Sequence, residues 1–271
     1  MKMPDYRPTL IGLPYDAGSS FRRGAAAAPP LIRAALRSQA SNLWSEALLD
    51  IGAPGALEDA GDLALPASPA ARQAIEAALY RLLSEGRRPI ALGGDHSVTY
   101  PILRALRPAW PELVVLHIDA HPDLYSEFEG DRFSHACTFA RIMEEGLADR
   151  LIQVGVRTMN GHQQAQAGRY GVEVIDMRAW AAGQRPVLRG PIYVSIDVDA
   201  LDPAFAPGVS HREPGGFAGR DVLGLLQTLP GPLAGADVVE FNPSQDALGI
   251  TAPVCAKLVK ELASRMLEIA A

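Results

Sequence analysis

Two apolar runs of strand length, residues 113–118 and 191–196, are each followed at once by closely spaced acidic and imidazole side chains. These side chains are Asp119, His121 and Asp123 after the first run and Asp197 and Asp199 after the second. Such runs predict buried strands, and residues i and i+2 of a strand point the same way. Four aspartates that converge on one side of the strand ends would repel one another unless cations neutralised them. The pattern therefore predicts a metal site, for two ions.

A third segment adds an imidazole to this set. Residues 89–92 predict a short strand that runs into Gly93 and Gly94, and His96 follows at the start of a helix. The predicted ligands, in chain order, are His96, Asp119, His121, Asp123, Asp197 and Asp199. An oxygen-rich set with two imidazoles and no thiolate favours manganese over zinc, with iron, cobalt and nickel as alternatives. Single Asp-x-Asp pairs often cap turns, but three sets in order, each after a strand, disfavour that interpretation.

The length and charge of the chain narrow the class of protein. Its 271 residues fit one α/β domain, residues 1–271, better than two small domains. A formal charge of -6 provides no basic surface, so we expect no nucleic-acid partner. Two cysteines and an N-terminus without a signal-like pattern predict a reducing, cytoplasmic setting. No apolar run reaches membrane-spanning length, so we expect no membrane association.

Strand and helix signals alternate along the whole chain. Eight strands are predicted, at residues 9–13, 48–51, 89–92, 113–118, 150–155, 172–175, 191–197 and 236–241. Apolar spacing predicts a helix between Pro69 and Glu85, with Ser68 as its N-cap and Gly86 as its stop, and a last helix at 252–269. Alternation of this kind implies a parallel sheet covered by helices on both faces. Ligands of such sheets gather beyond the carboxyl ends of the strands, where the three predicted metal segments lie.

The three metal segments resemble those of the ureohydrolase family, which comprises the arginases, the agmatinases and their relatives. Residues 128–136, 207–216 and 240–243 are similar to plant-type arginases and related agmatinases in particular. The resemblance implies a three-layer α/β/α domain with an eight-stranded parallel sheet. It also implies two manganese ions per chain and the release of urea from a small cationic guanidino substrate.

The resemblance assigns the ligands to two ions. One ion is expected to bind His96, Asp119, Asp123 and Asp197, and the other His121, Asp119, Asp197 and Asp199. Asp119 and Asp197 would then bridge. A guanidinium carbon is a poor electrophile because its charge is delocalised, and two close ions lower the pKa of a shared water enough to present hydroxide.

Two further residues are expected to act on the substrate by the same resemblance. His135 is similar to the family's histidine that carries a proton to the leaving amine, a role suited to an imidazole at neutral pH. Glu240 is similar to the carboxylate that orients the guanidinium. The alternatives are a surface or capping histidine and an ordinary ion pair at a strand end.

The tail of the substrate is the open question. The loop at 124–132 is acidic, which suits an ammonium group, while Arg132 in it could meet a carboxylate. Glu213 lies in a loop that could line the mouth of the pocket, and His211 in that loop is expected on the surface. We favour L-arginine slightly over agmatine, with another guanidino acid or guanidine itself as alternatives. His117 is expected to be a core histidine or a partner of the ligands.

Two other classes of protein are alternatives. A deacetylase acting on acetylated amines can share this fold, but it resembles a single-zinc site, which six ligands disfavour. A non-catalytic binding protein on a decayed scaffold is disfavoured because no predicted ligand is missing. The family resemblance also implies a homo-oligomer, a trimer or hexamer.

Overall fold

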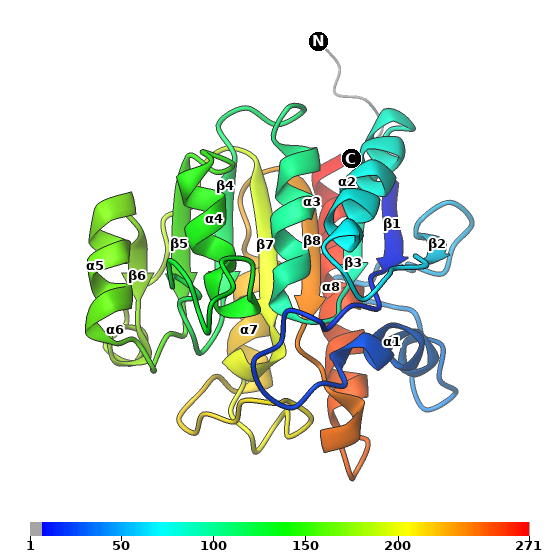
Figure 1. Ribbon diagram of the computed structural model, residues 1–271. Coiled ribbons are helices and arrows are strands. Elements are labelled where there is room, and N and C mark those ends of the chain that lie inside the picture. Colours follow the sequence, from blue (N-terminus) through cyan, green and yellow to red (C-terminus); the bar gives the residue numbers. More distant parts are fainter. Residues whose placement is uncertain (1–6, 271) are drawn as a thin grey trace.

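The computed structural model describes residues 7–270, which form one eight-stranded sheet with helices on both faces (Figure 1). The strands lie in the order β2-β1-β3-β8-β7-β4-β5-β6, and every pairing between neighbours is parallel. Their bounds are β1 Arg7–Gly12, β2 Glu58–Asp62, β3 Arg87–Leu92, β4 Val114–Ile118, β5 Arg150–Val154, β6 Glu173–Ile175, β7 Ile192–Asp197 and β8 Leu233–Val239. This confirms the predicted α/β class.

The eight α-helices of the described chain divide between the two faces of the sheet. Their bounds are α1 Ala28–Leu36, α2 Ala70–Ser84, α3 Thr99–Leu106, α4 Thr138–Glu144, α5 Gly161–Tyr170, α6 Met177–Ala181, α7 Gly219–Gln227 and α8 Thr251–Ala270. Helices α1, α6, α7 and α8 share one hydrophobic core with the sheet, and α2 to α5 share the other. Alternate strand residues enter the two cores: Leu116 and Val194 the first, Val115 and Tyr193 the second. Both faces of the sheet are therefore covered by helices and shielded from water, as is usual for all-parallel sheets.

One predicted strand is wrong. Residues 48–51 follow a tight turn: Leu48 has φ 60° and is largely exposed, and Asp50 makes only an isolated antiparallel bridge with Trp44. The strand at that place in the chain is β2, whose sequence is polar and whose residues beyond Glu58 are exposed. It pairs only with β1, at the edge of the sheet, where backbone hydrogen bonds suffice and no apolar side chains are needed.

The predicted helix ends are close to those observed. Helix α2 is capped by Pro69 without a side-chain hydrogen bond, so Ser68 is not its N-cap; the Ser68 carbonyl instead accepts from the Ala71 N–H. Gly86, at φ 70°, ends the helix as predicted, since a glycine adopts this left-handed conformation without a steric penalty. Within residues 7–270, no helix is both long and apolar enough to cross a membrane.

Candidate metal centre and active site

The predicted ligands meet at the carboxyl ends of adjacent central strands, at the lower edge of the sheet in Figure 1. Asp119 follows β4 directly and Asp197 is the last residue of β7, while His96 opens the short 3₁₀ turn η2 (His96–Val98) after β3. Because β3, β8, β7 and β4 are consecutive in the sheet, three segments distant in sequence become neighbours in space.

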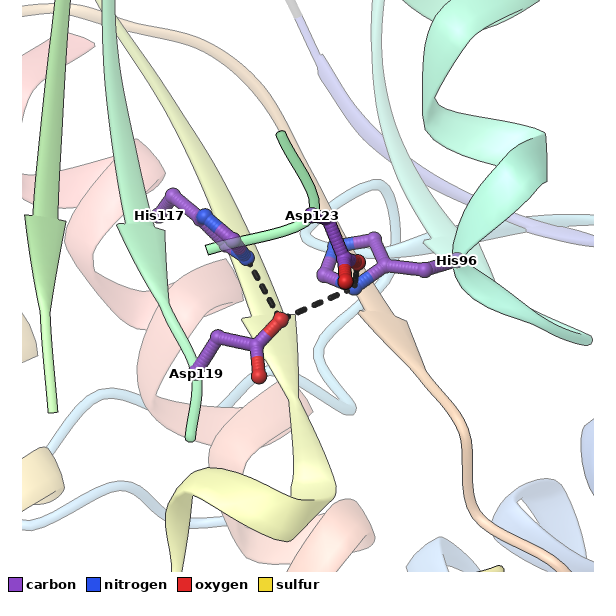
Figure 2. A group of neighbouring side chains, drawn as sticks. All are labelled: His96, His117, Asp119 and Asp123. Carbon is purple, nitrogen blue, oxygen red and sulfur yellow. Dashed lines mark hydrogen bonds and ion pairs between the residues drawn. The ribbon is translucent and has the colours of Figure 1, made fainter. Parts of the chain in front are cut away.

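One group of ligands surrounds His96. Its Nδ1 atom lies 3.2 Å from a carboxylate oxygen of Asp119, 3.2 Å from one of Asp123 and 3.2 Å from one of Asp197. Figure 2 shows His96, Asp119 and Asp123 directed at a common point. Donor atoms roughly 3 Å apart are what adjacent ligands of an octahedral cation with bonds of about 2.1 Å require.

The second group contains His121. Its Nδ1 atom lies 3.1 Å from Oδ2 of Asp199 and 3.4 Å from Oδ1 of Asp119. Asp119 thus offers Oδ2 to the His96 group and Oδ1 to the His121 group. Asp197 contacts the His96 group through Oδ2, while its Oδ1 accepts the Asp199 N–H at 2.7 Å. A carboxylate with one oxygen in each group is the geometry of a bridging ligand.

The charge of these groups makes them suitable for cations. Burial, together with the neighbouring carboxylates of Asp199 and Asp119, raises the pKa of Asp197 well above its usual range. Burial also raises the pKa of Asp199. The Nδ1 atom of His96 is buried and has no hydrogen-bond partner among the described residues, although three carboxylates face it. Carboxylates and a bare imidazole nitrogen packed this closely are satisfied by a divalent ion.

His135 and Glu240 form a pair beside these ligands. His135 lies in the turn η3 (His135–Cys137), and its Nδ1 is 2.8 Å from Oε1 of Glu240. Burial opposes a charge on the ring, but the Glu240 carboxylate outweighs it and raises the pKa of His135 to about 9. On its other side, Nε2 of His135 is 2.8 Å from the hydroxyl of Ser20. The imidazole is therefore poised to hold a proton at neutral pH.

Two of these residues have unfavourable backbone conformations. Asp123 has φ 48° and Glu240 has φ 64°, the left-handed region that side chains other than glycine rarely adopt. Such conformations persist where the surrounding structure enforces them, and they cluster at functional sites.

A cavity of about 200 Å³ opens onto both the metal ligands and the His135–Glu240 pair. The acidic residues of its lining all belong to these two groups: Asp123, Asp197, Asp199 and Glu240. The remaining lining consists of uncharged groups and imidazoles, namely Ser20, His121, Tyr125, Phe128, His135, Ala136, Thr158, Gln163 and His211. The cavity thus has an acidic floor and a wall without acidic side chains in the described chain.

The two predicted contacts to the substrate tail do not lie on this cavity. Arg132 is half exposed and pairs with Glu144 at 2.9 Å. The backbone carbonyl of Glu213 accepts two hydrogen bonds from the Arg157 guanidinium. The predicted substrate contacts of these two residues therefore find no support, because the paths of their loops direct them elsewhere.

The prediction that His211 is a surface residue is wrong. Its ring is partly buried, with centroids 5.7 Å from His121 and 5.4 Å from His135. The Phe21 ring also lies close to it, with the ring centroids 5.5 Å apart. Burial and the neighbouring charged His135 lower the pKa of His211. Ser20 also lines the cavity, which the sequence did not predict. A loop that folds over a site leaves no periodic pattern of apolar residues.

His117 is expected to be a core histidine or a partner of the ligands. It is fully buried, and its Nε2 atom lies 2.7 Å from Oδ2 of Asp119 (Figure 2). Burial raises the pKa of the Cys137 thiol to about 12, which leaves it unreactive at neutral pH. Asp95 is buried and caps η2 by accepting hydrogen bonds from Ser97, so its role is structural.

Comparisons with known proteins identify the family of this chain. The model of the Arginase family matches residues 7–264. Arginase 1, mitochondrial, of Arabidopsis thaliana is 45% identical, over 95% of this chain and 80% of that protein. The guanidinopropionase of Pseudomonas aeruginosa is 38% identical, over 97% of this chain and 87% of that protein.

A solved structure gives the same result. The arginase from Medicago truncatula matches with a TM-score of 0.91 at 42% identity, over 97% of this chain and 88% of that chain. These findings confirm the resemblance inferred from the motifs, including its plant-type character. The chain belongs to the arginase family of hydrolases.

Proposed function

We propose that this protein is a dinuclear manganese ureohydrolase that cleaves L-arginine to urea and the corresponding amine. The observation that carries the proposal is the placement of Asp119, whose two carboxylate oxygens each face a different histidine. That geometry favours a pair of ions over the single zinc ion of a deacetylase-like enzyme. The donor set, four carboxylates and two imidazoles without thiolate, favours manganese.

The residues beside the ligands suit guanidinium hydrolysis. Two ions bound here would supply the nucleophile by lowering the pKa of a water molecule. Glu240 makes its hydrogen bonds to His135 and to the His96 N–H through Oε1, which leaves Oε2 to accept from a guanidinium N–H. A charge-assisted bond of this kind would orient the guanidinium carbon towards the ligands.

His135 then has the task of protonating the leaving amine. Its contact with Glu240 keeps the ring protonated at neutral pH, and it lies on the wall of the same cavity. The Ser20 hydroxyl at 2.8 Å holds the ring from the opposite side. The proton donor is therefore fixed relative to the carboxylate that holds the substrate.

The cavity wall favours a guanidino acid over agmatine. Agmatine carries a second cation at its far end, and the described wall has no acidic side chain to meet it. A carboxylate at that end would find donors: Oε1 of Gln163 is bound by the Asn160 N–H, which leaves its amide nitrogen to donate, and His211 offers an imidazole. The arginases among the relatives act on such a substrate by name, and guanidinopropionase names a second guanidino acid as the alternative.

The cellular setting and assembly are further parts of the proposal. We expect a cytoplasmic protein, whereas the Arabidopsis relative carries the name mitochondrial. We also expect a homo-oligomer, a trimer or hexamer, and no nucleic-acid partner, consistent with the formal charge of -6.

Urea release tests the proposed function directly. The protein loaded with manganese should release urea from L-arginine and, more slowly, from 4-guanidinobutyrate, because both carry the guanidinium group and a carboxylate. Agmatine, which replaces the carboxylate of 4-guanidinobutyrate by an ammonium group at nearly the same length, should react more slowly than either. Absence of urea from all three substrates would refute the function, and a preference for agmatine would refute the substrate assignment.

A change at His211 tests how the protein recognises the tail of the substrate. His211→Ala removes one donor to the carboxylate, so kcat/KM for L-arginine and 4-guanidinobutyrate should fall about 10- to 100-fold, while that for agmatine stays within about threefold. Arg132→Ala is the control, because the sequence suggests that Arg132 could meet the carboxylate, whereas in the structure it pairs with Glu144 outside the cavity. Steady-state kinetics on the three substrates would contradict this assignment if Arg132→Ala, and not His211→Ala, separated acids from agmatine.

A change at His135 tests the proton transfer. His135→Ala should lower kcat by roughly 10²- to 10⁴-fold with metal content unchanged, because the leaving amine loses its proton donor. In Glu240→Gln, the pKa of His135 should fall from about 9, since the carboxylate that offsets burial is gone. Nuclear magnetic resonance titration of the ring measures the shift. Full activity of His135→Ala would reduce this histidine to a bystander.

A further inference from the structure

The two nitrogens of the His135 ring have different partners, and only one of them can pass on a proton. Nδ1 lies 2.8 Å from Oε1 of Glu240. The nearby His135 outweighs the effect of burial and lowers the pKa of Glu240, so its carboxylate is ionised and can only accept. Nδ1 therefore carries a hydrogen and keeps it. Nε2 is the ring atom from which a proton can leave.

Nε2 of His135 faces two atoms of a single residue. The hydroxyl oxygen of Ser20 lies 2.8 Å from it, and the backbone nitrogen of Ser20 lies 3.2 Å from it. When Nε2 carries a hydrogen, it donates to the hydroxyl oxygen. When Nε2 is bare, it accepts from the Ser20 N–H, which can only donate. Nε2 thus has a partner before and after it gives up a proton, which lowers the free energy needed for the transfer.

Ser20 lies between this nitrogen and the cavity. Its side chain is partly buried and lines the same cavity as His135 and the metal ligands. Within residues 7–270, the Ser20 hydroxyl has no hydrogen-bond partner other than His135, so it can still bond to a group in the cavity. The other two hydroxyls of the lining, those of Tyr125 and Thr158, bond elsewhere.

The segment between β1 and α1 holds Ser20 in this place. Figure 1 shows the segment in dark blue, where it crosses the lower edge of the sheet. Before Ser20, the carbonyl of Gly18 accepts the His135 N–H at 3.0 Å. After it, the carbonyl of Arg22 accepts from the Asn242 amide at 3.0 Å. The hydroxyl is therefore fixed beside the ring by contacts on both sides of Ser20.

We propose that the Ser20 hydroxyl relays the proton from His135 to the leaving amine, which makes Ser20 a catalytic residue. The C–N bond of the substrate breaks, its electron pair stays on the departing nitrogen, and that nitrogen takes the hydroxyl hydrogen of Ser20. The Ser20 oxygen takes the hydrogen of Nε2 in the same step, so the serine ends as it began and His135 is left neutral. The water consumed by hydrolysis supplies a hydroxide, whose oxygen ends in urea, and a proton, which restores His135. This inference rests on the function proposed above.

The basicity of the leaving group tests the relay. L-Canavanine is L-arginine with an oxygen in place of the CH₂ group beside the guanidinium. Its leaving group, an alkoxyamine, is a much weaker base than an alkylamine and depends less on a proton donor. Ser20→Ala should therefore lower kcat for L-arginine about 10- to 100-fold and kcat for L-canavanine by less than about threefold. An equal loss on both substrates, or no loss on either, would overturn the relay.

Ser19→Ala is the matched control. The Ser19 hydroxyl belongs to the same loop, but it bonds to Oδ2 of Asp95 at 3.4 Å and does not line the cavity. This variant should keep kcat for both substrates within about threefold of the wild-type value. The same selective loss in Ser19→Ala would assign the effect to the loop and overturn the relay. A wild-type protein that releases urea from neither substrate would instead refute the proposed function.

A double variant separates a relay from two independent effects. Residues that pass on one proton act as a unit, so Ser20→Ala should cause no further loss once His135→Ala has removed the proton donor. The kcat of the double variant for L-arginine should equal that of His135→Ala within about twofold. Losses that multiply would show that Ser20 acts independently of His135, which would overturn the relay.

Discussion

Four aspartates buried at the ends of apolar strands determine how the site and the loops around it are arranged. Asp119, Asp123, Asp197 and Asp199 are nearly or fully inaccessible to water, and the fold brings them within contact of two histidines. Carboxylates in such a place are unfavourable without cations, so the protein is best understood with metal ions bound. The close-packed sheet that carries these residues is shielded from water and keeps their spacing fixed.

The loops around the metal ligands contain residues in unfavourable backbone conformations, and these residues complete the site. The left-handed conformations of Asp123 and Glu240 direct two carboxylates inward where a regular backbone would not. Gly94 allows the N-terminal loop to lie against the site, because a Cβ atom there would be 1.7 Å from the carbonyl oxygen of Tyr15. That loop brings the Ser20 hydroxyl to His135. Closure of the site thus depends on single residues outside the ligand set.

Sequence reasoning succeeds where side-chain period and burial agree. The apolar runs predict β4 and β7 and so place Asp119 and Asp197 at the ends of neighbouring strands, and the structure brings all six predicted ligands together. The strand period itself does not extend to the other ligands, because Asp199 lies in the 3₁₀ turn Val198–Ala200. It fails where backbone pairing alone forms an element, as in the polar edge strand β2, and where an apolar stretch such as 48–51 turns at an exposed residue.

Contacts between distant loops are the other part that a single sequence does not reveal. The paths of the loops decide that His211 enters the cavity and that Arg132 leaves it, and no spacing rule encodes either.

The bridge between two ions proposed for Asp119 is open to a spectroscopic test. Electron paramagnetic resonance can follow the titration of manganese into the metal-free protein. Binding is expected to end at two equivalents per chain with the final spectrum of a magnetically coupled pair, because a shared carboxylate would hold the ions about 3.5–4 Å apart. Saturation at one equivalent, or a final spectrum of isolated manganese ions, would show that Asp119 does not bridge a pair of ions.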